Sequence, residues 1–158
     1  MPVVGTVTDR HVDLRRPAVA FGNTTVGEPT TRAIVVDNLG TTTEELAVTT
    51  TDTDFSLVDS GDESLTLAPG ESERLALEAN LSVPEQLTAT LQVTNESATD
   101  VGDTAVLNAT GQAPQFSVVQ SGPVTFSDTP INSTSTETIE FENTGEATLS
   151  VSLADAFN

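Results

Sequence analysis

The chain of 158 residues offers few side chains that could act as a catalytic base or a metal ligand. His11 is its single histidine, and Cys, Lys, Trp and Tyr are absent. A nucleophilic Ser or Thr needs a neighbouring base, and one histidine cannot build a zinc site. Glycosidase-like carboxylate pairs could form, but such pairs usually lie among aromatic sugar platforms. The sequence predicts a non-enzymatic protein with no cofactor and no metal, in which His11 is exposed or caps a turn.

Two short acidic stretches, residues 52–54 and 59–63, bring carboxylates close together. Calcium is bound by six or more oxygen ligands, and neither stretch has the twelve-residue spacing of an EF-hand loop. A hydrated acidic surface explains both stretches without a cation.

Five asparagines lie in N-x-[ST] triplets, the acceptor pattern for N-linked glycans. Glycans there would indicate surface loops of an exported or released protein. A chain rich in Ser and Thr also forms such triplets by composition alone, so both interpretations remain open. The candidate acceptors are Asn23, Asn80, Asn95, Asn108 and Asn132.

Arginines gather near the start of this otherwise acidic chain, where residues 9–17 contain Arg10, Arg15 and Arg16. Arginine can bind a carboxylate through two parallel hydrogen bonds. The segment is therefore a candidate surface for docking on an acidic protein neighbour. The alternative is local pairing with the two aspartates of the same segment.

The overall charge excludes two classes of partner. The 24 Asp and Glu residues outweigh the 5 Arg and give a formal net charge of −19. Nucleic acids and anionic lipid surfaces are bound through Lys and Arg, so neither is expected here. Dispersed acids without any Lys resemble proteins of extreme halophiles, in which molar salt screens self-repulsion within about 3 Å. The expected source is a salt-loving archaeon or a virus that infects one.

Alternating apolar residues predict an all-β fold. In one segment Leu75 and Leu77 share a face, while Arg74 and Glu78 lie on the other, as in a half-buried strand. Seven or eight short antiparallel strands within about 95 residues predict an immunoglobulin-like β-sandwich. The expected strands are residues 17–21, 31–37, 44–50, 54–58, 63–67, 71–80, 87–94 and 103–110.

The same pattern occurs twice. Residues 21–40 align with residues 126–145 without a gap, so that Phe21 matches Phe126 and Asn38 matches Asn143. A period of about 100 residues indicates an array of whole domains. The sequence therefore predicts tandem immunoglobulin-like β-sandwiches, of which the second is incomplete.

The first copy also resembles a known family. Its ordered motifs include Phe21-Gly22, "LAPGES" at residues 67–72 and "VLNATG" at residues 106–111. This order resembles ASH or Hydin-type immunoglobulin-like domains, which include the choice-of-anchor D modules of prokaryotic and archaeal surface proteins. It departs at "EANLSVP", residues 78–84, where the family usually has an aromatic residue before a proline. The resemblance implies a β-sandwich used for structure or protein interaction, without chemistry.

Four parts are expected along the chain: an N-terminal strand or linker (1–16), a complete sandwich (17–111), a linker (112–123) and the first half of a second module (124–158). A half sandwich exposes a strand edge and an apolar face. We expect either that more chain follows in the natural protein, or that another subunit completes the module by strand addition.

These features predict a structural or interaction protein of an oligomeric assembly, on a virion or a cell surface. Because the first residues lack the apolar region of a signal peptide, a haloarchaeal virus component of the decoration, turret or fibre type is the first interpretation. Part of a haloarchaeal surface or adhesion protein is the second. A module that binds a small ligand or a carbohydrate is the third.

Overall fold

The structure is a computed structural model that describes residues 12–58, 64–95 and 101–153. It divides into a first unit, Met1–Gly111, and a second unit, Gln112–Asn158. The described residues form strands and loops only, so no helix among them is long and apolar enough to cross a membrane.

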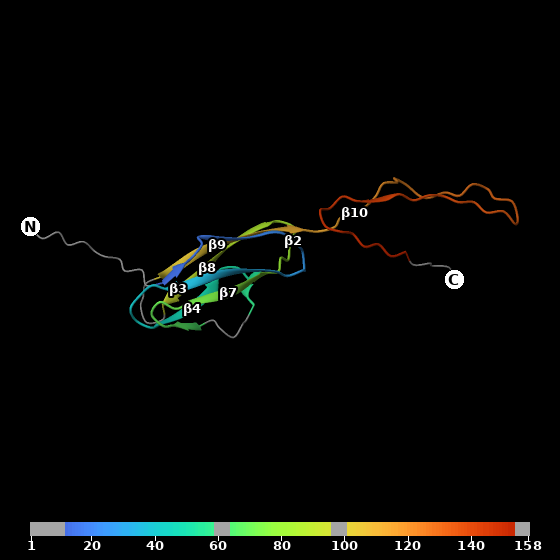
Figure 1. The fold of residues 1–158 in the computed structure, drawn as a ribbon. Helices are drawn as coiled ribbons and strands as arrows, with labels where there is room; N and C mark the ends of the chain where they lie inside the picture. The colour runs from blue at the N-terminus through green and yellow to red at the C-terminus, as the bar shows by residue number, and fades with distance from the viewer. Residues whose placement is uncertain (1–11, 59–63, 96–100, 154–158) are drawn as a thin grey trace, which may run out of the picture. The chain divides into compact units, whose positions relative to one another are not determined.

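One layer of the first unit is a four-stranded sheet in which every pairing is antiparallel. Its strand order is β1-β3-β7-β5, which brings together segments far apart in the sequence (Figure 1). The strands are β1 (Val12–Leu14), β3 (Thr30–Asn38), β7 (Ser72–Ala79) and β5 (Phe55–Leu57).

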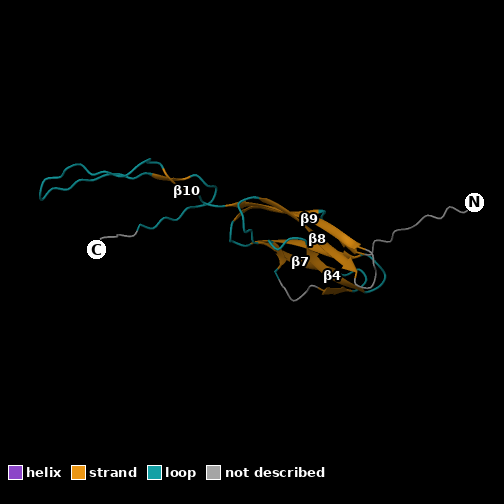
Figure 2. Cartoon of the chain, turned by 180° about the vertical axis from the view of Figure 1, so that it is seen from behind, coloured by secondary structure: helices purple, strands orange, loops and turns teal. Residues whose placement is uncertain are grey.

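The second layer is a five-stranded sheet with the order β2-β9-β8-β4-β6. Figure 2 shows β9, β8 and β4 of this sheet from behind. A register shift between Val93 and Thr94 of β8 leaves Gly102 of β9 as an extra residue, a bulge in β9, which increases the local twist. The strands are β2 (Ala18–Thr25), β9 (Val101–Gln112), β8 (Gln86–Asn95), β4 (Glu44–Thr50) and β6 (Ser64–Leu67).

The hydrophobic core lies between the two sheets, because alternate residues of each strand point inward. Leu77 and Leu91 are fully buried in opposite sheets. The rings of Phe21 and Phe55 lie 5.5 Å apart at their centroids in a tilted arrangement. Leu81 is fully buried in the segment where the resembled family usually has an aromatic residue.

The predicted fold class is confirmed, since the chain is all-β and its first unit is a two-layer sandwich. The eight expected strands correspond to β2 through β9, with end points that differ by four residues at most. β1 lies wholly within residues 1–16, the range expected as an N-terminal strand or linker.

The second unit contains two short strands, β10 (Phe116–Val118) and β11 (Phe141–Asn143), which pair antiparallel. Figure 2 draws most of the remaining chain of this unit as loop. β10 lies inside residues 112–123, which the sequence indicated to be a linker. That segment is therefore a strand over part of its length.

Candidate functional site

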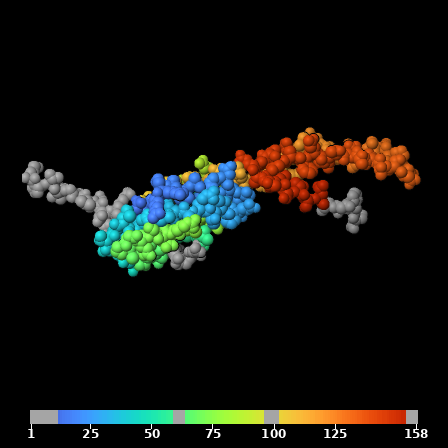
Figure 3. Space-filling view, in the orientation of Figure 1, coloured from blue at the N-terminus to red at the C-terminus, as the bar shows by residue number. Residues whose placement is uncertain are grey.

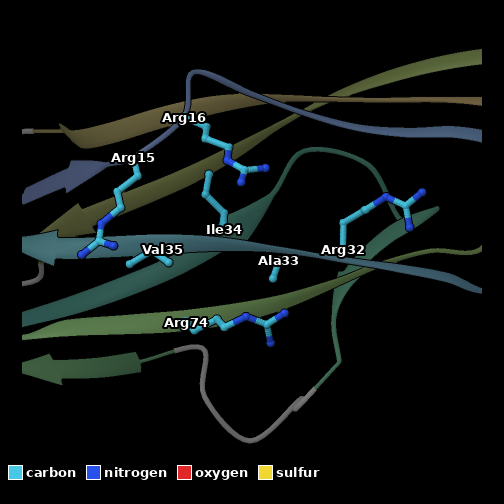
Figure 4. Close-up of a pocket in the computed structure, with 7 residues that line it drawn as sticks. All are labelled: Arg15, Arg16, Arg32, Ala33, Ile34, Val35 and Arg74. Atoms are coloured by element: carbon cyan, nitrogen blue, oxygen red, sulfur yellow. The ribbon is translucent and has the colours of Figure 1, made fainter.

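Four of the five arginines surround a hollow of 350 Å³ over β3, here called the arginine hollow (Figure 4). Its floor includes Ala33 and Val35, and Arg15, Arg16, Arg32 and Arg74 stand around it. In a chain with a net charge of −19, this gathering of cations is a distinct electrostatic feature.

The hollow is assembled by strand pairing. Val35 of β3 lies directly opposite Arg74 of β7, and opposed residues of paired strands point to the same face. Arg15 and Arg16 directly follow β1, the edge strand on the other side of β3. The space-filling view shows the blue β1 segment, the lighter blue β3 and the green β7 side by side on one face (Figure 3). Three chain segments thus contribute to one surface.

Arg15 forms an ion pair with Asp37 within the first unit. Its Nε and Nη2 donate to the two carboxylate oxygens of Asp37 at 2.7 and 2.8 Å. The Asp37 carboxylate also accepts a hydrogen bond from the Ser72 hydroxyl. The hydrogen bond from Arg15, followed by that from Ser72, holds the pKa of Asp37 below its ordinary value, and the pair raises the pKa of Arg15.

The remaining arginines of the hollow differ in their partners. Arg32 donates to the backbone carbonyls of Thr31 and Phe21, both at 2.9 Å. Arg16 and Arg74 are exposed, and their guanidinium groups form no hydrogen bond or ion pair with any residue that the structure describes. These two cations can therefore bind an anionic group from outside the unit.

The predicted docking residues are thus partly brought together. Arg15 and Arg16 lie at the hollow, whereas Arg10 and His11 fall outside the described residues. Sequence reasoning missed Arg32 and Arg74, which reach the hollow from β3 and β7. The alternation in β7 signalled that Arg74 faces outward, but not that β7 lies beside β3.

The sequon asparagines have different environments. Asn23, Asn80 and Asn132 are exposed, and Asn108 is half-buried on the face opposite Leu107. The side-chain amide of Asn95 donates to the buried Glu44 carboxylate.

The acidic stretch at residues 52–54 has a local structural role. The Asp54 amide donates to Asp52 Oδ1 at 2.9 Å, and the Ser82 hydroxyl donates to Asp54 Oδ2 at 3.0 Å. Among the described residues no group of three or more His, Cys, Asp or Glu could hold a metal ion. Residues 59–63 fall outside that part of the chain.

The second unit repeats the strand pairing of the first in the same register. Val12 pairs with Asn38 in β1 and β3, and Phe116 pairs with Asn143 in β10 and β11. The amide of Arg15 donates to Val35 O at 3.1 Å, as the amide of Val119 donates to Glu140 O at 3.0 Å. β10 and β11 are therefore the structural counterparts of β1 and of the end of β3.

The second unit nevertheless exposes side chains that the first unit buries. Exposed fractions rise from 1% for Phe21 to 63% for Phe126, and from 2% for Ile34 to 53% for Ile139. Val36 is fully buried, while its counterpart Phe141 is 40% exposed. We call Phe126, Ile139 and Phe141 the exposed core positions. In the first unit β2, β3 and β4 pair with β9, β7 and β8 respectively, and the described residues of the second unit form no counterpart of these three partner strands.

Comparison with known proteins adds information about the fold. No family model matches the sequence, and no curated protein matches it. The ASH/PapD-like domain of human CEP192 is similar, with a TM-score of 0.53 and 13% identity over 70% of this chain and 96% of that domain. The chain has an ASH/PapD-like β-sandwich fold.

Two bacterial structures are also similar to this chain. A protein of unknown function from Porphyromonas gingivalis W83 has a TM-score of 0.54 and 15% identity over 85% of this chain and 66% of that one. The secreted serine protease VesC from Vibrio cholerae has a TM-score of 0.50 and 15% identity over 68% of this chain. Only 24% of the protease is covered, so this likeness concerns the architecture.

Proposed function

We propose that the protein is a non-enzymatic structural and interaction module that binds polypeptide strands of another protein subunit. The observation that carries this proposal is the contrast between buried core residues in the first unit and the exposed core positions in the second. The two units share strand register and turn geometry. Apolar residues at equivalent positions of the two units are therefore suited to burial in a core.

The energetic reason is the apolar surface left in water. Fully burying one Phe or Ile side chain contributes about 1.5–3 kcal/mol. The second unit has three such side chains, at the exposed core positions. A partner strand beside residues 135–143 would supply backbone hydrogen bonds, as β7 does for β3. Its alternate side chains would cover Ile139 and Phe141. Strand addition therefore satisfies both the backbone and the apolar surface.

Within this proposal, the assembly is a virus particle of a halophilic host, with the protein as a decoration, turret or fibre component. The support is compositional: 24 acids, no lysine and a net charge of −19 suit a surface that stays hydrated in molar salt. Residence in a cell envelope is the alternative location, and it uses the same interaction.

Hydrogen–deuterium exchange of the full chain, free and in its native assembly, tests strand addition. We expect alternate amides of residues 135–143 to become protected in the assembly, since a new strand on one side would accept hydrogen bonds from every second amide. Equal exchange of these amides in both states would contradict the proposal. Whether the protein is recovered with virus particles or with envelopes decides the location.

A variant pair sharpens the test. Changing Phe126 and Ile139 to Ser should abolish recruitment to the assembly, because it removes the apolar surface to be covered. Val106, an exposed apolar residue of the first unit, provides the control, and Val106→Ser should be recruited normally. Recruitment of the double variant at the level of the control would refute the function.

A further inference from the structure

We propose that the arginine hollow docks the acidic second unit of another copy of this chain. This inference concerns a surface of the first unit and goes beyond strand addition to the second. It rests on the positions of charges in the two copies of the repeat.

The repeat makes two positions of the β3 segment acidic in the second unit. Arg32 of the first unit aligns with Glu137 of the second, and Val35, on the floor of the hollow, aligns with Glu140. The position of Arg15 is taken by Val119, as the shared backbone hydrogen bonds show. Arg32 and Val35 lie three residues apart, so their counterparts Glu137 and Glu140 point to opposite faces of the strand. The outward face that carries Val35 and Arg74 in the first unit carries Glu140 and Glu142 in the second.

The acidic face is exposed to solvent, and the second unit has no basic residue to neutralise it. Glu140 and Glu142 are both exposed. All five basic residues of the chain precede residue 75, so the second unit contains no Lys or Arg. The carboxylates of this unit thus have no cation of their own unit to pair with.

The hollow supplies the matching cations. Arg16 and Arg74 extend beside β3 from opposite sides (Figure 4), and both are exposed with no ion-pair partner among the described residues. Guanidinium groups bind carboxylates with paired hydrogen bonds. The apolar floor at Ala33 and Val35 can pack against the stems of the incoming Glu side chains.

A second copy is the occupant that the charges favour. The hollow lies on the first unit and its complement on the second, so docking between copies joins two different surfaces. Such a heterologous contact repeats head to tail and forms a ring or an open chain of molecules. The inference therefore assigns the protein the ability to form head-to-tail oligomers.

Salt should strengthen this association at first. Two chains that each carry a net charge of −19 repel each other over long distances in dilute buffer. At about 1 M salt the screening length is about 3 Å. This screening removes the long-range repulsion between the chains, whereas ion pairs in direct contact are weakened much less. We expect monomers at low salt and head-to-tail oligomers at about 1 M salt.

Sedimentation velocity on the full chain tests the proposal with two charge-reversal variants. Arg16→Glu with Arg74→Glu reverses the hollow, and Glu140→Arg with Glu142→Arg reverses the acidic face. Each variant alone should self-associate at least about tenfold more weakly than the natural chain, since like charges then meet. An equimolar mixture should recover association, because the reversed faces complement each other.

The matched control changes Glu28 and Glu85 to Arg. Both are exposed residues of the first unit outside the hollow, and the change in net charge equals that of the acidic-face variant. The control should associate like the natural chain. The circular dichroism melting curve of each variant verifies that the first unit is folded.

Three results would overturn the inference: a natural chain that stays monomeric at every salt concentration, a mixture that does not recover association, or a control that loses it. A compact monomer in which the two faces dock within one chain would also overturn it, because the occupant would not be a second copy. The Phe126 and Ile139 variant keeps both charged faces. Its behaviour therefore separates failure of this inference from failure of strand addition.

Discussion

Asn38 and Asn143 make the same two side-chain hydrogen bonds at equivalent positions of the two units. In each unit Oδ1 accepts from the amide of the glycine two residues later, at 2.9 Å for Gly40 and 3.0 Å for Gly145. Nδ2 donates to the carbonyl four residues later, at 2.8 Å for Thr42 and 2.7 Å for Ala147. A short Asn-x-Gly segment thus builds the same turn with or without a second sheet beside it.

Replacing Asn38 by Ala should destabilise the first unit by about 2–3 kcal/mol. Asn38 is buried and its Nδ2 also donates to Leu67 O at 2.9 Å, so the change leaves buried backbone groups without a partner. Urea denaturation followed by circular dichroism measures the loss. Asn143→Ala is the matched control and should leave this transition unchanged, because Asn143 is exposed in the other unit.

Replacing Phe55 by Ala should cost about 3–5 kcal/mol. The Phe55 ring is buried against Phe21 between the sheets, and its removal leaves a cavity. Phe116 also stacks on a second ring, that of Phe141, at 5.7 Å, but it is exposed. Phe116→Ala should therefore leave the unfolding of the first unit unchanged. Similar losses for both variants in thermal denaturation would contradict this assignment of the core.

The Arg15–Asp37 pair should make stability depend on acid pH. The pKa of Asp37 in the folded protein lies below its ordinary value of 3.8, so unfolding raises its proton affinity. The stabilisation is therefore fully present above about pH 4 and is lost as the pH falls through the folded pKa. The raised pKa of Arg15 has its effect only in strong alkali.

The variant Asp37→Asn isolates this effect. Its stability deficit relative to the natural chain should be largest at neutral pH and should shrink as the pH falls below about 4, because the unfolded natural chain then binds a proton at Asp37 more readily than the folded chain does. Urea denaturation at pH 7 and pH 3 gives both values. A deficit that is the same at the two pH values would show that the ion pair is not the source.

The turn at Asn132 should tolerate Gly but not Val. Asn132 has a φ of 69° and aligns with Gly27, whose φ is 79°. Both turns close with a 3.0 Å hydrogen bond, from Ser133 N to Pro130 O and from Glu28 N to Thr25 O. Asn132→Val should open the turn, since the left-handed backbone conformation costs a residue other than Gly or Asn about 1–2 kcal/mol. Faster amide exchange at Ser133 in the Val variant, and not in Asn132→Gly, is the expected result.

Glycopeptide mapping of protein from its native source should find glycans on Asn23 and Asn80 rather than on Asn95. The first two side chains are exposed. The amide nitrogen of Asn95, to which a glycan would be joined, donates to the buried Glu44 carboxylate. A glycan on Asn95 with none on Asn23 would contradict this order of preference.

Sequence patterns predicted the sandwich because strand signals are local. The alternation of Leu75 and Leu77 with Arg74 and Glu78 depends only on the two-residue period of a strand, and turns are marked by Gly, Pro and Asn. The pairing of strands is not local. The ion pair between Arg15 and Asp37 joins residues 22 positions apart, whereas the sequence suggested the nearer aspartates at positions 9 and 13.

β10 was missed for a simple reason of alignment. Phe21 and Phe126 match at one spacing, but Val12 of β1 and Phe116 of β10 match at a spacing one residue shorter. The additional residue lies in the bend between these strands and the matched phenylalanines. A comparison without gaps therefore stops at the bend, and the sequence predicts a linker where β10 lies.

The order of the strands also determines how the first unit would respond to tension. Its chain enters through β1 and β2 and leaves through β9, and β2 and β9 are neighbours in one sheet. A pulling force on the two ends would first act on β1, which three residue pairs join to β3. It would then load the contacts between β2 and β9, beginning near the 2.9 Å bond from Val106 N to Pro17 O. Under load the unit would lengthen in two steps, a small one that releases β1 and a larger one that opens the sandwich.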